Sequence, residues 1–160
     1  MMSTTSERFE LGDRTAAHRA ALWSAIYTAA GLLAGLGYRE LTRNASASGG
    51  QLAIMHTHLL TLGTVMMLVV TILVTIFPLA RQRTYRPFFI TYHIGVILTV
   101  GMQAVIGYRE LNGAADSAML NGIAGLGHIT ITAAFVLFFL ALLPAIRTQA
   151  PAVAPAQVAS

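Results

Sequence analysis

Residues 52–80 read LAIMHTHLLTLGTVMMLVVTILVTIFPLA, and this stretch decides the fold. It contains no formally charged side chain and is long enough to cross a lipid bilayer as a tilted helix. His56 and His58 stand inside it, separated by a single residue. An ionisable side chain within a membrane span is costly and generally faces a partner, a cofactor or a water-filled cavity. The two histidines are therefore the main candidates for chemistry in this chain.

The overall composition is that of an integral membrane protein. Of the 160 residues, 56% are hydrophobic and only 10% are charged, whereas soluble domains carry roughly 25% charge. The net charge of +4 comes from ten basic residues, all arginine, which lie in tails and loops and do not predict nucleic-acid binding. Cysteine is absent, which excludes disulfides, thiolate metal sites, iron–sulfur clusters and covalently attached c-type haem.

The hydropathy pattern predicts an all-α integral membrane protein, a bundle of four transmembrane helices. The predicted spans are about 20–38, 52–80, 87–108 and 118–146. Short connections between them make successive helices antiparallel. Residues 1–19 are predicted to form a tail or short surface helix, and the Ala- and Pro-rich residues 147–160 a disordered tail. The four-helix domain is thus predicted to cover residues 20–146.

Arginine counts predict the orientation of the bundle in the membrane, because cytoplasmic loops carry an excess of basic residues. The N-terminal side of the bundle has seven arginines and the opposite side has three. The seven are Arg8, Arg14, Arg19, Arg81, Arg83, Arg86 and Arg147. Both termini are therefore predicted to be cytoplasmic, and the histidines of the second and fourth spans are predicted to lie in the outer leaflet.

The sequence contains an internal repeat. GYREL at 37–41 recurs at 107–111, an offset of 70 residues, and the same offset pairs Gly31 with Gly101 and His58 with His128. Residues related by this offset are called repeat mates below. The repeat predicts a duplicated helical hairpin, with halves of about 20–80 and 87–146. Both halves enter the membrane from the same side, so their pseudo-two-fold axis would run along the membrane normal.

This symmetry predicts that His58 and His128 face each other at one depth, roughly 10 Å inside the span. Gly31 and Gly101 are predicted at a similar depth, where they would leave gaps for a flat macrocycle. Two histidines on facing helices are typical of the axial ligation of b-type haem. The sequence therefore predicts haem b bound by His58 with His128.

Other residues bear on this hypothesis. Arg39 and Arg109 are predicted at the outer rim, where guanidinium groups can pair with haem propionates. His56 points about 200° away from His58 around the helix, so it is expected to face a second protomer or the interfacial water. His93, the repeat mate of Trp23, is expected in an interfacial aromatic belt.

Two alternatives to haem remain open at this point. In one, His56, His58 and His128 hold a copper or zinc ion, and the chain is a non-haem metal-binding protein or a small transporter. In the other, the histidines only satisfy hydrogen bonds, and the chain is a structural or accessory subunit of a membrane complex.

HTHLLTLG at 56–63 and GLGHI at 125–129 resemble the motifs of a family of small bacterial membrane proteins, a four-span domain of unknown function. That resemblance implies the fold and a location in the bacterial inner membrane, but no activity. The His-x-His also resembles a helix of haem–copper oxidase subunit I. There, two such histidines point opposite ways and ligate two haems, in a subunit made of three pseudo-symmetric sets of four helices.

This second resemblance implies a homotrimer in which His56 and His58 of neighbouring protomers share haems, with His128 auxiliary. The chain has no counterpart of the copper-ligating histidines or of the cross-linked tyrosine, so a complete oxidase is not expected. Six-coordinate haem suits electron transfer with a redox partner or quinone, whereas a displaceable ligand suits redox or gas sensing. Whether the chain is an enzyme stays open.

Overall fold

The computed structural model describes the backbone of residues 3–43 and 50–148, and the side chains from Arg14 onward. This part of the chain is helical and contains no strand. Its elements are α1 (Ser3–Thr42), α2 (Gly50–His58), the π-helix η1 (Leu59–Val65), α3 (Met66–Ile76), the 3₁₀ turn η2 (Leu79–Arg81), α4 (Tyr85–Leu111) and α5 (Ala118–Arg147). Four stretches, counting α2–η1–α3 as one, are long and apolar enough to cross a membrane. The predicted fold class is confirmed.

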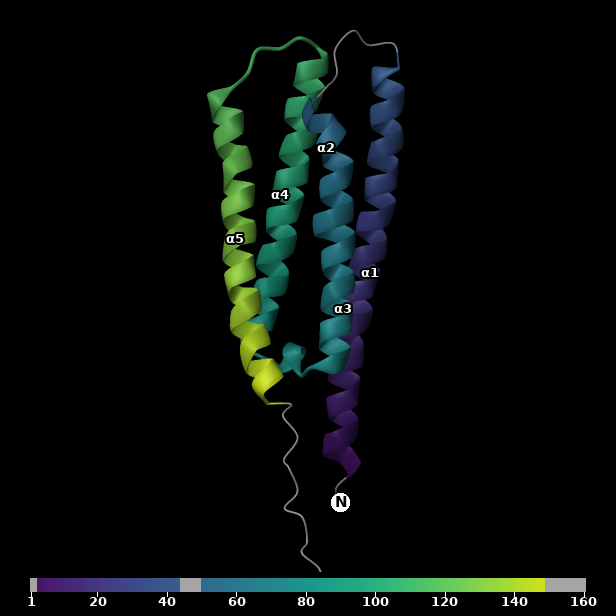
Figure 1. The fold of residues 1–160 in the computed structure, drawn as a ribbon, viewed down its shortest axis with the longest axis vertical. Helices are drawn as coiled ribbons and strands as arrows, with labels where there is room; N and C mark the ends of the chain where they lie inside the picture. Colours follow the sequence, from purple (N-terminus) through teal and green to yellow (C-terminus); the bar gives the residue numbers. More distant parts are fainter. Residues whose placement is uncertain (1–2, 44–49, 149–160) are drawn as a thin grey trace, which may run out of the picture.

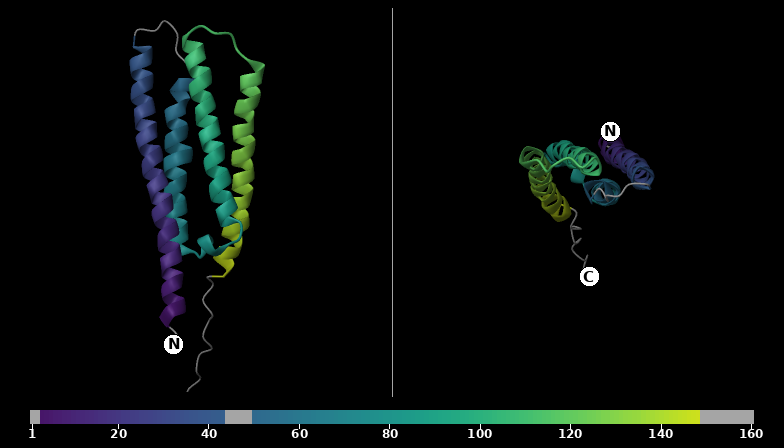
Figure 2. Two further views of the ribbon diagram at one scale, coloured as in Figure 1. Left: turned by 180° about the vertical axis from the view of Figure 1, so that it is seen from behind. Right: turned by 90° about the horizontal axis from the view of Figure 1, so that it is seen from above.

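The four spans run antiparallel to their chain neighbours (Figure 1). The α4–α5 connection lies at one end of the molecule and the α3–α4 connection at the other. Packing joins α1 to the α2–η1–α3 span, α2 to α4, and α4 to α5. Seen from above, α1 and α5 occupy opposite ends of this row (Figure 2). The bundle is therefore open along one side.

Helix boundaries differ from the sequence prediction, and two of the differences have a clear physical reason. The residues predicted as a separate tail begin the first helix, which starts at Ser3, because no proline interrupts the chain before Pro78. The second span ends at Ile76 instead of Ala80. Phe77 is extended there (φ −117°, ψ 151°), as expected for a residue that precedes proline. The predicted disordered tail, from residue 149 on, lies outside the described residues.

A π-helix interrupts the second span directly after His58. Its wider turns displace backbone carbonyl groups from the α-helical pattern, and neighbouring helices use two of them. Tyr92 Oη of α4 donates to the Leu62 carbonyl (2.8 Å), and Ser24 Oγ of α1 donates to the Thr64 carbonyl (3.1 Å). The π-helix thus fixes both α1 and α4 to the span that carries His58.

The core lies around α4, which packs against neighbours on two sides. In its most apolar window 44% of residues are buried, against 22% to 28% in the other spans. Phe88, Tyr92 and Val96 of α4 are fully buried. Large apolar side chains elsewhere face outward, as in α3 and α5, which is the arrangement that a lipid environment favours.

Candidate functional site

A cavity of about 360 Å³ lies between α2, α4 and α5, within the size range of small-molecule sites (roughly 300–1,000 Å³). It is lined by Gln51, Ile54, His58, Thr99, Gln103, Ile106, Asn121, Ala124, Gly125 and His128. His58 and His128, which the repeat pairs, therefore line one cavity. α2 supplies His58 and α5 supplies His128, while residues of α4 line the same cavity.

The two histidine rings are held in the same way. His58 Nδ1 lies 3.0 Å from the Ile54 carbonyl, and His128 Nδ1 lies 3.3 Å from the Ala124 carbonyl. A carbonyl can only accept, so each Nδ1 is the donor, and in the neutral ring Nε2 is then the nitrogen with the lone pair. Metal-bound histidines are commonly oriented by such a bond from the other ring nitrogen. Ile54 and Ala124 are also repeat mates, so the same histidine–carbonyl hydrogen bond occurs in both halves.

Sequence reasoning missed the polar groups that surround these histidines. Thr99 and Gln103 of α4 are 1% and 5% exposed. Thr99 Oγ1 and Gln103 Oε1 have no hydrogen-bond partner among the described residues, which is costly for buried polar atoms unless a ligand or water meets them. Gln51 and Asn121 are repeat mates seven residues before each histidine. This amide pair was a signal available in the sequence.

His56 lies elsewhere: where a second protomer or interfacial water was expected beside it, it contacts α1 of the same chain. A Cβ added to Gly35 would lie 3.8 Å from Cβ and Cγ of His56. His56 therefore faces α1, where the missing side chain of Gly35 makes room for the ring. His56 Nδ1 is buried without a hydrogen-bond partner in the described part of the chain. His56 does not line the cavity that contains His58 and His128.

The two glycines do not leave the symmetrical gaps that were predicted. A Cβ on Gly31 would lie 2.9 Å from Cδ2 of Leu60, so α1 uses this position to pack against the π-helix. Gly101 is exposed, with open space around it. The reason is that α1 and α4 present different faces to their neighbours, although their sequences are related. Neither glycine lines the histidine cavity.

The two arginines also lie outside that cavity. Arg109 donates to the Ala115 carbonyl (3.3 Å) and lines a smaller cavity of about 170 Å³ with Glu110 and Ser117. Ile106 lines both cavities, so Arg109 is adjacent to the histidine site. Arg39 is exposed at the end of α1 and lines neither cavity.

His93 is buried and does not belong to an interfacial belt. It is 7% exposed, its Nδ1 lies 2.6 Å from Tyr27 Oη, and its ring is 4.4 Å from that of Trp23. The repeat mates Trp23 and His93 thus contact each other where α1 and α4 approach. This contact fixes the end of the bundle opposite the α4–α5 connection.

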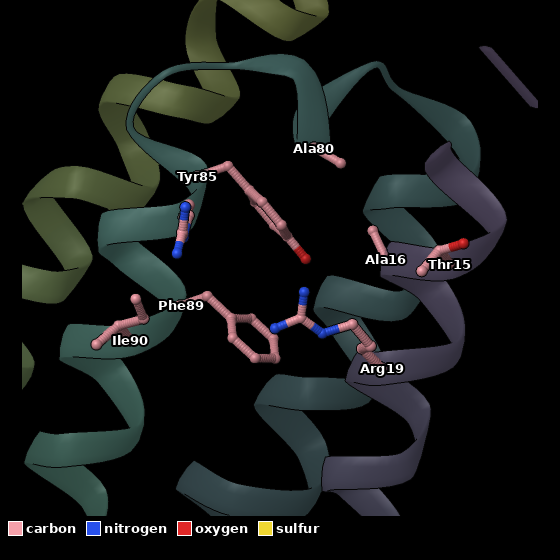
Figure 3. Close-up of a pocket in the computed structure, with 8 residues that line it drawn as sticks. Thr15, Ala16, Arg19, Ala80, Tyr85, Phe89 and Ile90 are labelled. Carbon is pink, nitrogen blue, oxygen red and sulfur yellow. The ribbon is translucent and has the colours of Figure 1, made fainter. Parts of the chain in front are cut away.

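A third cavity, of about 420 Å³, lies between α1, η2 and α4. Arg19 extends into it above the ring of Phe89, with its Cζ 5.4 Å from the ring centroid (Figure 3). Arg86 and Tyr85 also line it. Its guanidinium groups suit an anion and not a metal ion. Within the described residues no three His, Cys, Asp or Glu side chains come close enough to hold a metal together.

The chain belongs to a family described as "Protein of unknown function (DUF2871)", whose model matches residues 18–145. This confirms the predicted resemblance to a four-span family of unknown function. No curated protein and no solved structure matches the chain. The resemblance to haem–copper oxidase subunit I therefore has no support from these comparisons.

Proposed function

We propose that this protein binds b-type haem in the cavity between α2, α4 and α5, with His58 and His128 as axial ligands, and serves in electron transfer or in redox or gas sensing. One observation carries the proposal. Two histidines from different helices line one cavity, and each has its Nδ1 bonded to the carbonyl four residues earlier. In the neutral rings both Nε2 atoms then have the lone pair that ligation requires.

The number of histidines favours haem over a bare metal ion. Haem iron takes two axial protein ligands, whereas a closed zinc site takes four and an open one three. The cavity contains two histidines and no carboxylate or thiolate, and His56 faces away from it towards Gly35. The copper or zinc alternative would need a third ligand from outside this cavity.

The residues around the histidines would position and shield the haem. The π-helix after His58 bonds to α1 and α4 and so fixes the backbone next to that ligand. Thr99 and Gln103 offer hydrogen bonds from the α4 wall. Haem supplies one-electron redox chemistry when bound. His128 is the more exposed histidine, so it is the ligand that a diatomic gas would displace.

The first test is a reduced-minus-oxidised visible spectrum of the purified protein after incubation with haem. Low-spin bands are expected for the wild type. His128→Ala should give a five-coordinate spectrum that added imidazole restores, and His58→Ala should lose most of the bound haem.

His56→Ala is the matched control, because His56 is on the same helix but faces α1. An unchanged spectrum is expected. If His56→Ala instead abolished low-spin haem while His128→Ala did not, the shared-haem trimer would replace this proposal. A wild-type protein that stays colourless with haem would exclude haem binding, and metal analysis would then separate a copper or zinc protein from a structural subunit.

A further inference from the structure

A contact inside the chain, between the second span and α4, is repeat-related to the open side of the bundle. The second span packs against α4, and the contact is close at Gly107, where an added Cβ would lie 2.5 Å from Leu52 N. At the same level Glu110 Oε2 accepts a hydrogen bond from Gln51 N (3.1 Å). The internal repeat relates α4 to α1 and the second span to α5. The corresponding contact would therefore join α1 to α5, which lie apart within one chain (Figure 2).

The α1 face of this missing contact is exposed along its whole length. On α4 the face consists of Tyr92, Val96, Gln103 and Gly107, all buried. Their repeat mates on α1 are Leu22 (52% exposed), Ile26 (45%), Leu33 (68%) and Gly37, which has open space around it. These four repeat mates lie on one stripe of α1, as the four buried residues lie on one stripe of α4.

The α5 face of this missing contact is exposed as well. Leu52, which contacts Gly107 of α4, is 5% exposed. Its mate on α5 is Gly122, with nothing near it. Ile129, seven residues further along the same face of α5, is 66% exposed. Both sides of the corresponding contact are thus present in the chain and unpaired within it.

Lipid alone does not account for this surface. Gly37 and Gly122 would face each other at the level where Gly107 meets Leu52, and small residues are typical of places where membrane helices approach closely. The polar contact between Gln51 N and Glu110 is not repeated, because Asn121 N already donates to the Ser117 carbonyl (3.0 Å) and Glu40 accepts from Arg43 (3.4 Å).

We infer that α5 of one copy of this chain packs against α1 of the next copy, by the same contact that joins α2 to α4 within a copy. The two helices are antiparallel, as α2 and α4 are, so all copies have one orientation in the membrane. Each copy uses one face on α1 and another on α5. Head-to-tail contacts of this kind form a ring when the rotation between copies closes, and such a closed ring is part of the inference. Ala29 and Leu33, mates of Thr99 and Gln103, then lie beside α5 and cover the exposed side of His128.

Cysteine cross-linking tests this contact directly, because the chain has no cysteine of its own. Gly37→Cys combined with Gly122→Cys, oxidised in native membranes, should give a ladder of disulfide-linked copies that ends at the number in the ring. Leu32→Cys with Gly122→Cys is the matched control. Leu32 is 59% exposed and lies on α1, about 140° around the helix from Gly37, so little cross-linking is expected.

Equal cross-linking in the control, or no ladder in the test pair, would overturn the inference. Efficient cross-linking of Gly37→Cys alone would also overturn it, because it would show a symmetrical α1–α1 contact. None of these results depends on haem, so the contact can fail while the proposed function stands, and the reverse also holds.

A second measurement uses mass in lipid nanodiscs. Gly37 and Gly122 have open space around them within the chain, so leucine at either position leaves the single copy intact. Gly37→Leu and Gly122→Leu should shift the particles from assemblies towards the 17.0 kDa chain. Gly101→Leu, at another open glycine, should leave the assembly unchanged. A wild type that is monomeric in nanodiscs would overturn the inference.

Discussion

The two halves of this protein share a sequence pattern but pack their hairpins differently. In the first half, α1 meets the second span through Gly31, Gly35 and Gly63, which contact Leu60, His56 and Tyr27. In the second half, α4 meets α5 through Gly95 and Gly127, which contact Ile131 and Thr99. The two sets are not repeat mates. Gly101, Val105 and Ala133, the mates of the first set, are exposed.

In a membrane, a sequence repeat does not by itself specify how helices pack. Hydrophobicity places both hairpins in the bilayer but does not select which helix faces meet, because lipid tails are as apolar as the side chains. Close contacts at glycines and hydrogen bonds select the faces instead. The first half contains the π-helix after His58, whereas α5 continues as an α-helix after His128. The histidines keep equivalent positions despite these different surroundings.

The largest expected difference in folding stability is between substitutions of Gly63 and of its repeat mate Ala133. Gly63→Leu would drive a side chain into the ring of Tyr27, and we expect a loss of roughly 3 kcal/mol or failure to fold. Ala133→Leu places the same side chain on an exposed surface of α5 and should change stability by less than about 0.5 kcal/mol. Denaturation of the detergent-solubilised protein by SDS measures both. Similar losses would mean that the two hairpins pack alike.

A smaller difference in folding stability is expected between substitutions of Gly107 and of Gly37. Gly107→Ala would crowd the backbone of Leu52 and should cost about 2 kcal/mol. Gly37→Ala meets no atom in the same chain, so its effect on the unfolding of an isolated copy should be near zero. If copies associate through this face, the effect of Gly37→Ala will grow with protein concentration. A loss at Gly37 that is independent of concentration would contradict the open bundle.

The smallest expected effect concerns the π-helix. Tyr92→Phe removes the hydroxyl that donates to the Leu62 carbonyl and should cost about 0.6 kcal/mol, the average for such bonds in membrane helices. The amides around Leu62 should also exchange hydrogen faster. Tyr108→Phe is the control, since Tyr108 is 60% exposed. Equal exchange in the two variants would show that this bond does not hold the π-helix.

Sequence reasoning succeeded for features that are local or repeated. It predicted the four spans, their antiparallel order and the pairing of His58 with His128, and both histidines line one cavity. It did not predict that His56, Gly31 and Gly101 lie outside the histidine cavity, because the helices of the two hairpins do not pack on each other through equivalent faces. The orientation of the termini, the haem and the redox partner stay predictions.

By itself, the sequence determined that this protein crosses the membrane four times and carries two equivalent histidines. Charge-free apolar runs must enter the bilayer, and duplication places equivalent residues at equal depth. Only the tertiary structure decided which helix faces meet, that Thr99 and Gln103 join the histidines, and that α1 and α5 stay apart. These choices depend on close contacts between particular side chains and backbone atoms, such as Tyr27 on Gly63, and apolar periodicity does not encode such contacts in a membrane.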